Sequence, residues 1–220
     1  MKESIPLVLQ LQKISRAMSK EVCFLGAGGH AKVVIEIAED LGFEIIGIYD
    51  QNINVNKILD YPVSNDIESL SEKQNVFFAF GNNYYRKINS LKYKSADFNL
   101  IHPTSVISRS AVLGNGNVVM AGAVINSSVQ IGNHCVINTS ASIDHDCEIE
   151  DFVHISPSAA LAGNIKVKEG AQVGIGASVK QNVTIGKWSV VGAGAVVIND
   201  VPDNVIVVGN PARIIKSNLN

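Results

Sequence analysis

Residues 107–202 read ISRSAV LGNGNV VMAGAV INSSVQ IGNHCV INTSAS IDHDCE IEDFVH ISPSAA LAGNIK VKEGAQ VGIGAS VKQNVT IGKWSV VGAGAV VINDVP in blocks of six. Every block begins with Ile, Leu or Val, and its fifth residue is usually small or branched. Asn117 and Ser189 are the exceptions at that fifth position. This period is too short for ankyrin or leucine-rich repeats and is typical of a parallel β-helix, in which each block forms one short strand and one corner.

Three such blocks close one triangular coil, so the repeat makes five coils and a fraction of a sixth. Coils stacked at the ordinary strand spacing of about 4.8 Å give a prism about 25 Å tall. A prism of this kind is a scaffold, and its chemistry depends on the side chains at its corners and faces.

The chain before the repeat has a different pattern. Short apolar segments that are typical of buried strands alternate with segments of helical periodicity, which predicts a small parallel α/β sheet. We expect strands at 21–26, 44–49 and 76–80, and helices at 30–41 and 84–93.

These patterns divide the chain into three parts. Residues 1–19 form an N-terminal extension to which we assign no function, and residues 20–100 form a Rossmann-like α/β domain. Residues 101–220 form the β-helix domain, and His102-Pro103 marks the passage into it.

Composition excludes several classes of protein. With 46% hydrophobic and 17% charged residues and a formal charge of −2, the chain is neither disordered nor a general binder of nucleic acid or anionic lipid. Three cysteines do not make a disulfide framework, and we find no signal peptide and no segment for membrane insertion. We therefore expect a cytoplasmic protein.

Candidate ligand-binding residues follow three successive predicted strands. Gly28, Gly29 and His30 lie between the first strand and its helix, Asp50 ends the second strand, and Gly81 ends the third. Open α/β sheets bind ligands at this edge, where glycine loops and helix N-termini meet phosphate groups. Tight packing also explains a glycine loop. Because this segment supplies only one mononucleotide-binding half, a nucleotide or nucleotide sugar is favoured over NAD.

The repeat holds a candidate general base. In Ile143-Asp144-His145-Asp146-Cys147 the isoleucine points inward, so His145 and Asp146 fall at the following corner. A carboxylate that reached His145 would raise its pKa and fix its tautomer, which suits a base acting on an amine or hydroxyl. Gly163 lies one coil further on, where its N–H is placed to stabilise an oxyanion. A solvated surface turn explains the same residues.

A zinc site is a weaker interpretation, although γ-class carbonic anhydrases also use a hexapeptide prism. His134, His145 and His154 are spaced by 11 and 9 residues, so three-histidine zinc requires them to converge across subunits. Cys135 and Cys147 occupy inward positions and are expected to be core residues. We expect no metal.

The sequence resembles a known family in six segments. They are GAGGHAKVV, GIYD, FGNNYYRKI, IHPTSVIS, NTSASIDHDCEIEDFVHISP and VVGNPARII. Together they resemble the sugar acyltransferases of the sialic acid O-acetyltransferase type, which include UDP-4-amino-sugar N-acetyltransferases of the bacillosamine pathway. The resemblance covers residues 20–215. It implies a left-handed β-helix, a nucleotide sugar on the α/β domain, and acetyl-CoA along the prism between subunits of a homotrimer.

The resemblance also implies roles for individual residues. His145 would be the general base, with Asp146 raising its basicity. The residues that would contact acetyl-CoA are His154, Gly163, Ile175 and Ala193. The residues that would bind the nucleotide sugar are Gly28, Gly29, His30, Asp50, Gln51 and Gly81. The chain departs from the pattern at Asp146, where bacillosamine enzymes have Glu, at Gly28, where a serine-type residue is usual, and at Ala193, where relatives carry glycine.

The sequence therefore predicts an acetyl-CoA-dependent N-acetyltransferase acting on a nucleotide-linked 4-amino sugar, with UDP as the expected carrier, in surface-glycan biosynthesis. O-acetylation of a sialic-acid-like sugar is the alternative, because the same base serves a hydroxyl. A non-catalytic, trimeric nucleotide-sugar-binding protein is the alternative from another class. The zinc hydratase is the third.

Overall fold

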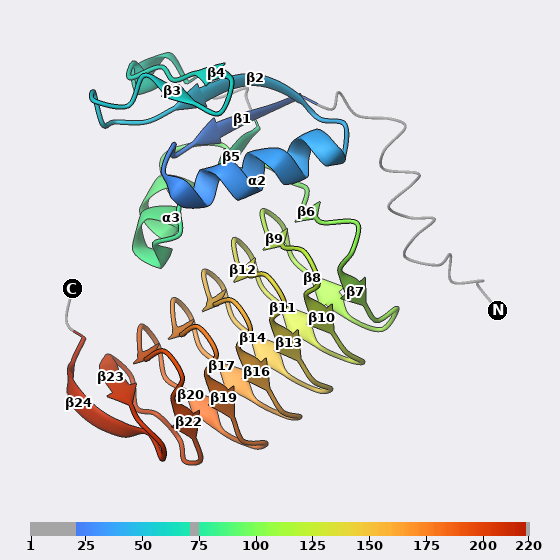
Figure 1. Cartoon of the computed structure of the whole chain (residues 1–220), viewed down its shortest axis with the longest axis vertical. Helices are drawn as coiled ribbons and strands as arrows, with labels where there is room; N and C mark the ends of the chain where they lie inside the picture. Colours follow the sequence, from blue (N-terminus) through green and yellow to red (C-terminus); the bar gives the residue numbers. More distant parts are fainter. Residues whose placement is uncertain (1–20, 71–74, 219–220) are drawn as a thin grey trace.

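The structure is a computed structural model that describes residues 21–70 and 75–218 (Figure 1). The predicted N-terminal extension, residues 1–19, lies outside the described residues. Figure 1 shows a small α/β layer seated on one side of a long, regular stack of coils.

The α/β layer has a three-stranded parallel sheet in the order β2-β1-β5, which confirms the predicted sheet. Its elements are β1 (Glu21–Leu25), α2 (Gly29–Asp40), β2 (Glu44–Tyr49), β5 (Val76–Phe78) and α3 (Asn83–Ser90), with a hairpin of β3 (Lys57–Ile58) and β4 (Tyr61–Pro62) and a 3-10 turn, η1 (Ile67–Ser69). The second helix ends three residues before the predicted residue 93.

The repeat forms a parallel β-solenoid, as predicted, with three sheets that we call its six-stranded, five-stranded and eight-stranded faces. The six-stranded face holds β7 (Val106–Ile107), β10 (Val124–Ile125), β13 (Ser142–Ile143), β16 (Ala160–Leu161), β19 (Ser178–Val179) and β22 (Val196–Val197). The five-stranded face holds β8 (Val112–Leu113), β11 (Gln130–Ile131), β14 (Glu148–Ile149), β17 (Lys166–Val167) and β20 (Thr184–Ile185).

The eight-stranded face holds β6 (Leu100–Ile101), β9 (Val118–Val119), β12 (Val136–Ile137), β15 (His154–Ile155), β18 (Gln172–Val173), β21 (Val190–Val191), β23 (Val205–Val208) and β24 (Arg213–Ser217). All its neighbouring strands are parallel except the last pair, β23 and β24, which is antiparallel.

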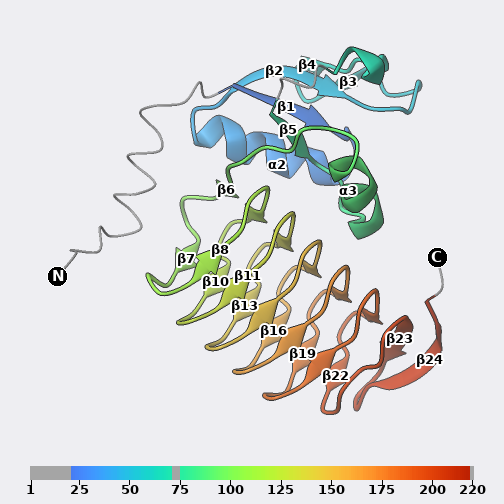
Figure 2. The ribbon, with the colours of Figure 1, turned by 180° about the vertical axis from the view of Figure 1, so that it is seen from behind.

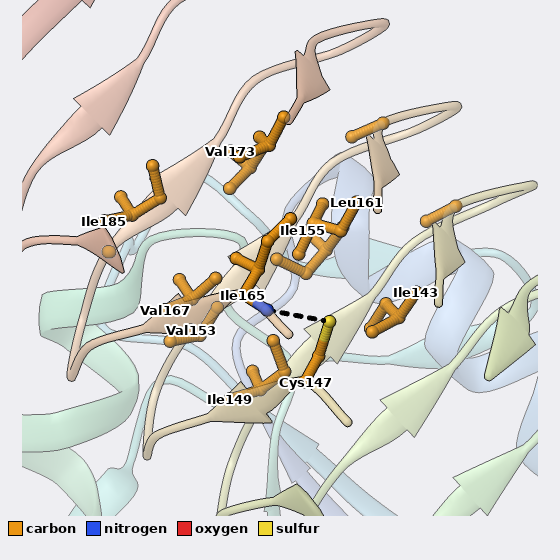
Figure 3. Close-up of a cluster of buried hydrophobic side chains, with 14 of the residues drawn as sticks. Ile143, Cys147, Ile149, Val153, Ile155, Leu161, Ile165, Val167, Val173 and Ile185 are labelled. Atoms are coloured by element: carbon orange, nitrogen blue, oxygen red, sulfur yellow. Dashed lines mark hydrogen bonds between the residues drawn. The ribbon is translucent and has the colours of Figure 1, made fainter. Parts of the chain in front are cut away.

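The first residue of each block fills the solenoid core. From Val119 to Val197, every sixth residue is aliphatic and at most 4% exposed (Figure 3). Cys135 and Cys147 are buried among them, as predicted, and the Ile165 N–H donates to the Cys147 sulfur at 3.4 Å. Burial raises the pKa of Cys135 to about 12, so its thiol stays protonated and unreactive.

The two polar exceptions in the core bind the backbone near the ends of the repeat. Asn117 accepts the Cys135 N–H at 2.7 Å and donates to the Gly132 carbonyl, and Ser189 accepts the Val205 N–H at 3.1 Å. A buried polar side chain is tolerated when its hydrogen bonds are made, which explains both breaks in the pattern.

The corners repeat as regularly as the strands. Every sixth residue from Gly116 to Gly194 has a φ between 54° and 68°, and most of these residues are Gly, Asn, Asp or Ser. Glycine adopts this left-handed conformation freely, and short polar residues tolerate it. The corner geometry therefore favours small or short polar residues at the fourth position of each block, and Asp146 is one of them.

The α/β layer covers part of the eight-stranded face (Figures 1 and 2). Val118, Met120 and Val136 of the solenoid belong to the same buried cluster as Val34 and Phe77 of the layer. In the triangular cross-section of the solenoid, the corner between the six- and five-stranded faces lies opposite the eight-stranded face, and so it lies farthest from this layer. Residue 145 lies at that corner.

Candidate active site

His145 and Asp146 form a hydrogen-bonded pair at the corner between β13 and β14. The His145 Nδ1 lies 2.8 Å from the Asp146 Oδ2, and both side chains are more than half exposed. The left-handed φ of 59° at Asp146 is the corner conformation common to the whole repeat. The solenoid backbone thus places the carboxylate beside the ring.

This pairing gives His145 the properties of a base. Because the carboxylate accepts a hydrogen bond from Nδ1–H, the lone pair lies on Nε2. The hydrogen bond that His145 donates to Asp146, supported by the nearby charge of Asp144, raises the pKa of His145. A more basic, tautomerically fixed imidazole is suited to taking a proton from an amine or hydroxyl.

Gly163 lies against the imidazole, one coil beyond it. A methyl group at this position would come 2.7 Å from the His145 Nε2 and 2.6 Å from its Cε1. Among the described residues, none accepts a hydrogen bond from the Gly163 N–H. Glycine therefore leaves room for the ring, and its own N–H has no hydrogen-bond partner among the described residues.

The same corner carries an open groove of about 400 Å³. It continues down three stacked coils and is lined by Asp144, His145, Ala162, Gly163, Asn164, Gln181 and Asn182. An elongated, open groove beside a base fits an extended ligand better than a compact one.

The predicted nucleotide-sugar residues lie at the carboxyl edge of the α/β sheet. Gly28 and Gly29 begin α2, and a methyl group added to either would meet nothing within 4 Å. The Asp50 carboxylate accepts the Ala27 N–H at 2.7 Å and the Asn52 N–H at 2.9 Å, so it ties two loops together. Gln51 is exposed beside it.

His30, Gly81 and His154 meet between the sheet edge and the solenoid. The ring centroids of His30 and His154 are 6.1 Å apart, and the His154 Nδ1 donates to the Gly81 carbonyl at 3.2 Å. Asn138 Nδ2 donates to the His154 Nε2 at 3.0 Å. These two hydrogen bonds place the proton of the neutral ring on Nδ1. His154 points outward from the prism, as the repeat requires, but the α/β layer covers it and leaves it 7% exposed.

Burial keeps this histidine pair neutral. Desolvation, followed by the charges of Arg86 and His30, lowers the pKa of His154 to about 3. Desolvation and Arg86 likewise lower the pKa of His30 to about 4, and its Nε2 is buried without a partner among the described residues. Neither ring is a reservoir of protons at neutral pH.

Ile175 and Ala193 lie on a different corner from His145. They follow β18 and β21 at the corner between the eight- and six-stranded faces, where the Gly194 N–H donates to the Ile175 carbonyl. Ile175 is 55% exposed. The structure thus divides the predicted residues into two groups, with His145, Asp146 and Gly163 at one corner and the remaining residues around the eight-stranded face.

Sequence reasoning assigned no role to Arg86, which is buried with Asn83 where α3 meets the solenoid. The signal was present, because the inward face of α3 is formed by Asn83, Arg86 and Asn89 rather than by apolar residues. A short helix without an apolar stripe must bind its neighbour through polar contacts.

Among residues 21–70 and 75–218, no group of three His, Cys, Asp or Glu side chains is arranged to hold a metal ion. None of their helices has the length and apolar character needed to cross a membrane.

Residues 21–90 match the PglD N-terminal domain. A curated relative, an uncharacterized protein of Acanthamoeba polyphaga mimivirus, is 34% identical over 106 residues. That match takes in 47% of this chain and spans only 22% of the length of the relative.

Solved structures match over nearly the whole chain. A histidine-to-asparagine variant of perosamine N-acetyltransferase from Caulobacter crescentus, in complex with CoA and GDP-perosamine, is 39% identical with a TM-score of 0.84. The match covers 90% of this chain and 97% of that one. The acetyltransferase domain of PglB from Neisseria gonorrhoeae, in complex with acetyl coenzyme A, is 37% identical with a TM-score of 0.81, and the match covers 90% of this chain and 100% of that one.

A third solved structure is WeeI from Acinetobacter baumannii, which is 27% identical with a TM-score of 0.78. The match covers 88% of this chain and 99% of that one.

Proposed function

This chain belongs to the family of sugar N-acetyltransferases that carry a PglD N-terminal domain, and on that premise we propose that it transfers an acetyl group from acetyl-CoA to the amine of a nucleotide-linked amino sugar. The observation that carries this proposal is the His145–Asp146 pair, with its 2.8 Å hydrogen bond, next to Gly163, whose N–H has no partner among the described residues. It supplies a base and an oxyanion donor in one place.

The proposed chemistry uses each of these groups once. His145 Nε2 accepts a proton from the acceptor amine as the amine nitrogen bonds to the thioester carbonyl carbon. The Gly163 N–H donates to the carbonyl oxygen, where negative charge develops. The carbon–sulfur bond then breaks, and His145 returns the proton to the sulfur. The acetyl group passes directly to the sugar without a covalent enzyme intermediate.

Acceptor and base do not meet within one chain of this shape. The predicted nucleotide-sugar residues lie over the eight-stranded face, and His145 lies on the opposite corner of the triangle. We therefore infer that His145 of one protomer acts on the sugar nucleotide held by its neighbour.

A closed three-fold ring brings these parts together. If each protomer turns its six-stranded face toward the axis, the His145 corner of one chain approaches the Ile175 corner of the next. That second corner borders the eight-stranded face, where His154 and Gly81 lie. Acetyl-CoA would then lie between two chains, with Ile175 and Ala193 on one side and Gly163 on the other.

The six-stranded face has the composition that such an interface needs. Its outward residues are all small or aliphatic and uncharged: Val106, Val124, Ser142, Ala160, Ser178 and Val196. The five-stranded face instead carries an exposed Lys166–Glu148 ion pair, at 2.7 Å, which is typical of a solvated surface. Depletion of charge favours the six-stranded face as the contact between copies.

A panel of nucleotide-linked amino sugars tests this function. Thiol release from acetyl-CoA is measured with UDP-, GDP-, dTDP- and CMP-linked acceptors, and mass spectrometry locates the acetyl group. We expect N-acetylation of a 4-amino sugar. UDP is the carrier predicted from the sequence, and the relative that holds GDP-perosamine makes the guanosine carrier its necessary comparison. Acetylation of a sialic acid hydroxyl alone, or tight nucleotide-sugar binding without thiol release, would contradict the proposal.

A further inference from the structure

Helix α3 binds the solenoid through buried polar side chains. Arg86 is 2% exposed and Asn83 is 8% exposed. No carboxylate forms an ion pair with Arg86 among the described residues. Burial lowers the pKa of Arg86 to about 10, so the guanidinium remains charged at neutral pH. A buried cation without an ionic partner is costly unless each of its N–H groups donates a hydrogen bond, so Arg86 must find acceptors on neighbouring groups.

The solenoid offers α3 a ladder of backbone carbonyls. His134, Phe152 and Gly170 are corner residues spaced by 18, and all three have left-handed φ values, between 54° and 68°. In the described part of the chain, no backbone N–H donates to these three carbonyls. Each coil therefore presents one unpaired acceptor at this corner, one above the other.

Arg86 and Asn83 satisfy three consecutive rungs of this ladder. Arg86 Nε donates to the His134 carbonyl at 2.8 Å, and one terminal nitrogen donates to the Phe152 carbonyl at 3.0 Å. That nitrogen also donates to the Asn83 Oδ1, whose own amide donates to the Gly170 carbonyl at 2.9 Å. The helix is thus registered to the solenoid coil by coil.

The other terminal nitrogen of Arg86 reaches the candidate site. It donates to the Phe80 carbonyl at 2.8 Å and to the Gly81 carbonyl at 3.2 Å. The Gly81 carbonyl also accepts the hydrogen bond from His154, and a methyl group at Gly81 would lie 3.5 Å from the His30 Cβ. One guanidinium therefore joins the solenoid rungs to the loop that follows β5.

We propose that Arg86 is a positioning residue. It fixes the position of the nucleotide-sugar-binding edge along the axis of the solenoid, and so brings the acceptor amine within reach of His145 of the neighbouring protomer. This inference rests on the proposed function. It adds a role for a residue that touches neither the reacting atoms nor His145.

Arginine suits this role because its five N–H donors lie in one rigid plane. Lysine keeps the charge but donates from a single nitrogen, so it cannot hold Gly81 and two solenoid rungs together. The loop after β5 would then shift relative to the coils. A misplacement of about 1 Å costs on the order of 10²-fold in rate.

Arg86→Lys in the full-length protein tests the proposal, with Lys87→Met as the matched control. Lys87 also links α3 to the solenoid, through an ion pair with Glu169 and a contact 5.1 Å from the Trp188 ring centroid, but it does not reach Gly81. We expect Arg86→Lys to lower kcat by about 10- to 100-fold. Its dissociation constant for the nucleotide sugar, measured by calorimetry, should stay close to that of the wild type. Lys87→Met should retain nearly full kcat.

Three results would overturn the proposal. They are an unchanged kcat in Arg86→Lys, a loss of binding as large as the loss of kcat, and an equal loss of kcat in Lys87→Met. If Arg86→Lys does not fold, Arg86→Gln decides by the same criteria, since its shorter side chain has two N–H donors in place of five. A wild-type protein that acetylates no acceptor refutes the proposed function instead. Hydrogen exchange of segment 80–83, expected to quicken in Arg86→Lys, then tests the positioning role alone, and unchanged exchange contradicts it.

Discussion

Replacing Gly163 with alanine is a direct probe of the position of the base. The new methyl group would lie 2.6 to 2.7 Å from the His145 ring, whereas ordinary contacts begin near 3.4 Å. The ring must therefore move by roughly 1 Å, and a displacement of this size costs on the order of 10²-fold in kcat. Gly163 has no left-handed φ, so its backbone accepts alanine and keeps the amide N–H.

The assay separates a displaced base from a damaged fold. Because His145 is exposed, its ring can swing away at little cost, and we expect the Tm of Gly163→Ala to remain near that of the wild type. Loss of the contact with Asp146 should also lower the pKa of His145 toward its ordinary value. Ser127→Ala, on the coil at the other side of His145, adds no atoms and is the control. A Gly163→Ala protein with wild-type kcat would refute the assignment of Nε2 as the proton acceptor.

Two further predictions concern protons. Asp146→Asn removes the hydrogen bond that raises the pKa of His145, so the acidic limb of the kcat–pH profile should move to lower pH. The plateau of kcat should also fall, although less than in His145→Asn. An acidic limb that does not move would contradict the pairing. Burial lowers the pKa values of His30 and His134 to about 4 and of His154 to about 3, whereas the unfolded chain protonates histidine near 6.5. The contribution of these histidines to the free energy of unfolding is therefore fully present above pH 6.5. It falls by about 1.4 kcal/mol per pH unit for each histidine as the pH drops toward 4. Calorimetry should show a lower Tm at pH 5 than at pH 7, and an equal Tm would contradict the burial of these rings.

The solenoid was predictable because its core pattern is local. Each aliphatic residue at the start of a block points inward in its own coil, so a period of six determines the strands without knowledge of distant contacts. The pairing of His145 with Asp146 and the contact with Gly163 follow from the same arithmetic, since one is a neighbour in sequence and the other is one coil away.

The position of the α/β layer was not predictable in this way. An outward residue of a solenoid strand can face either solvent or the α/β layer. Nothing in the block that contains His154 distinguishes a covered outward histidine from an exposed one. The contacts of Arg86 with residues 48 and 66 positions away depend on where α3 meets the coils. Such contacts arise from tertiary packing and leave only a weak signal, a short helix with a polar inward face.

The central claim is that each active site is shared between two chains, and mixed trimers test it most directly. His145→Asn subunits lack the base, and Gly29→Leu subunits place a side chain in the open space of the nucleotide-sugar edge. Each variant alone should be inactive. In trimers co-expressed at equal amounts and purified with two tags, a closed head-to-tail ring predicts that roughly a third of the sites combine an intact base with an intact edge. Recovery of about that share of wild-type kcat would support the account, and verified mixed trimers without activity would contradict it.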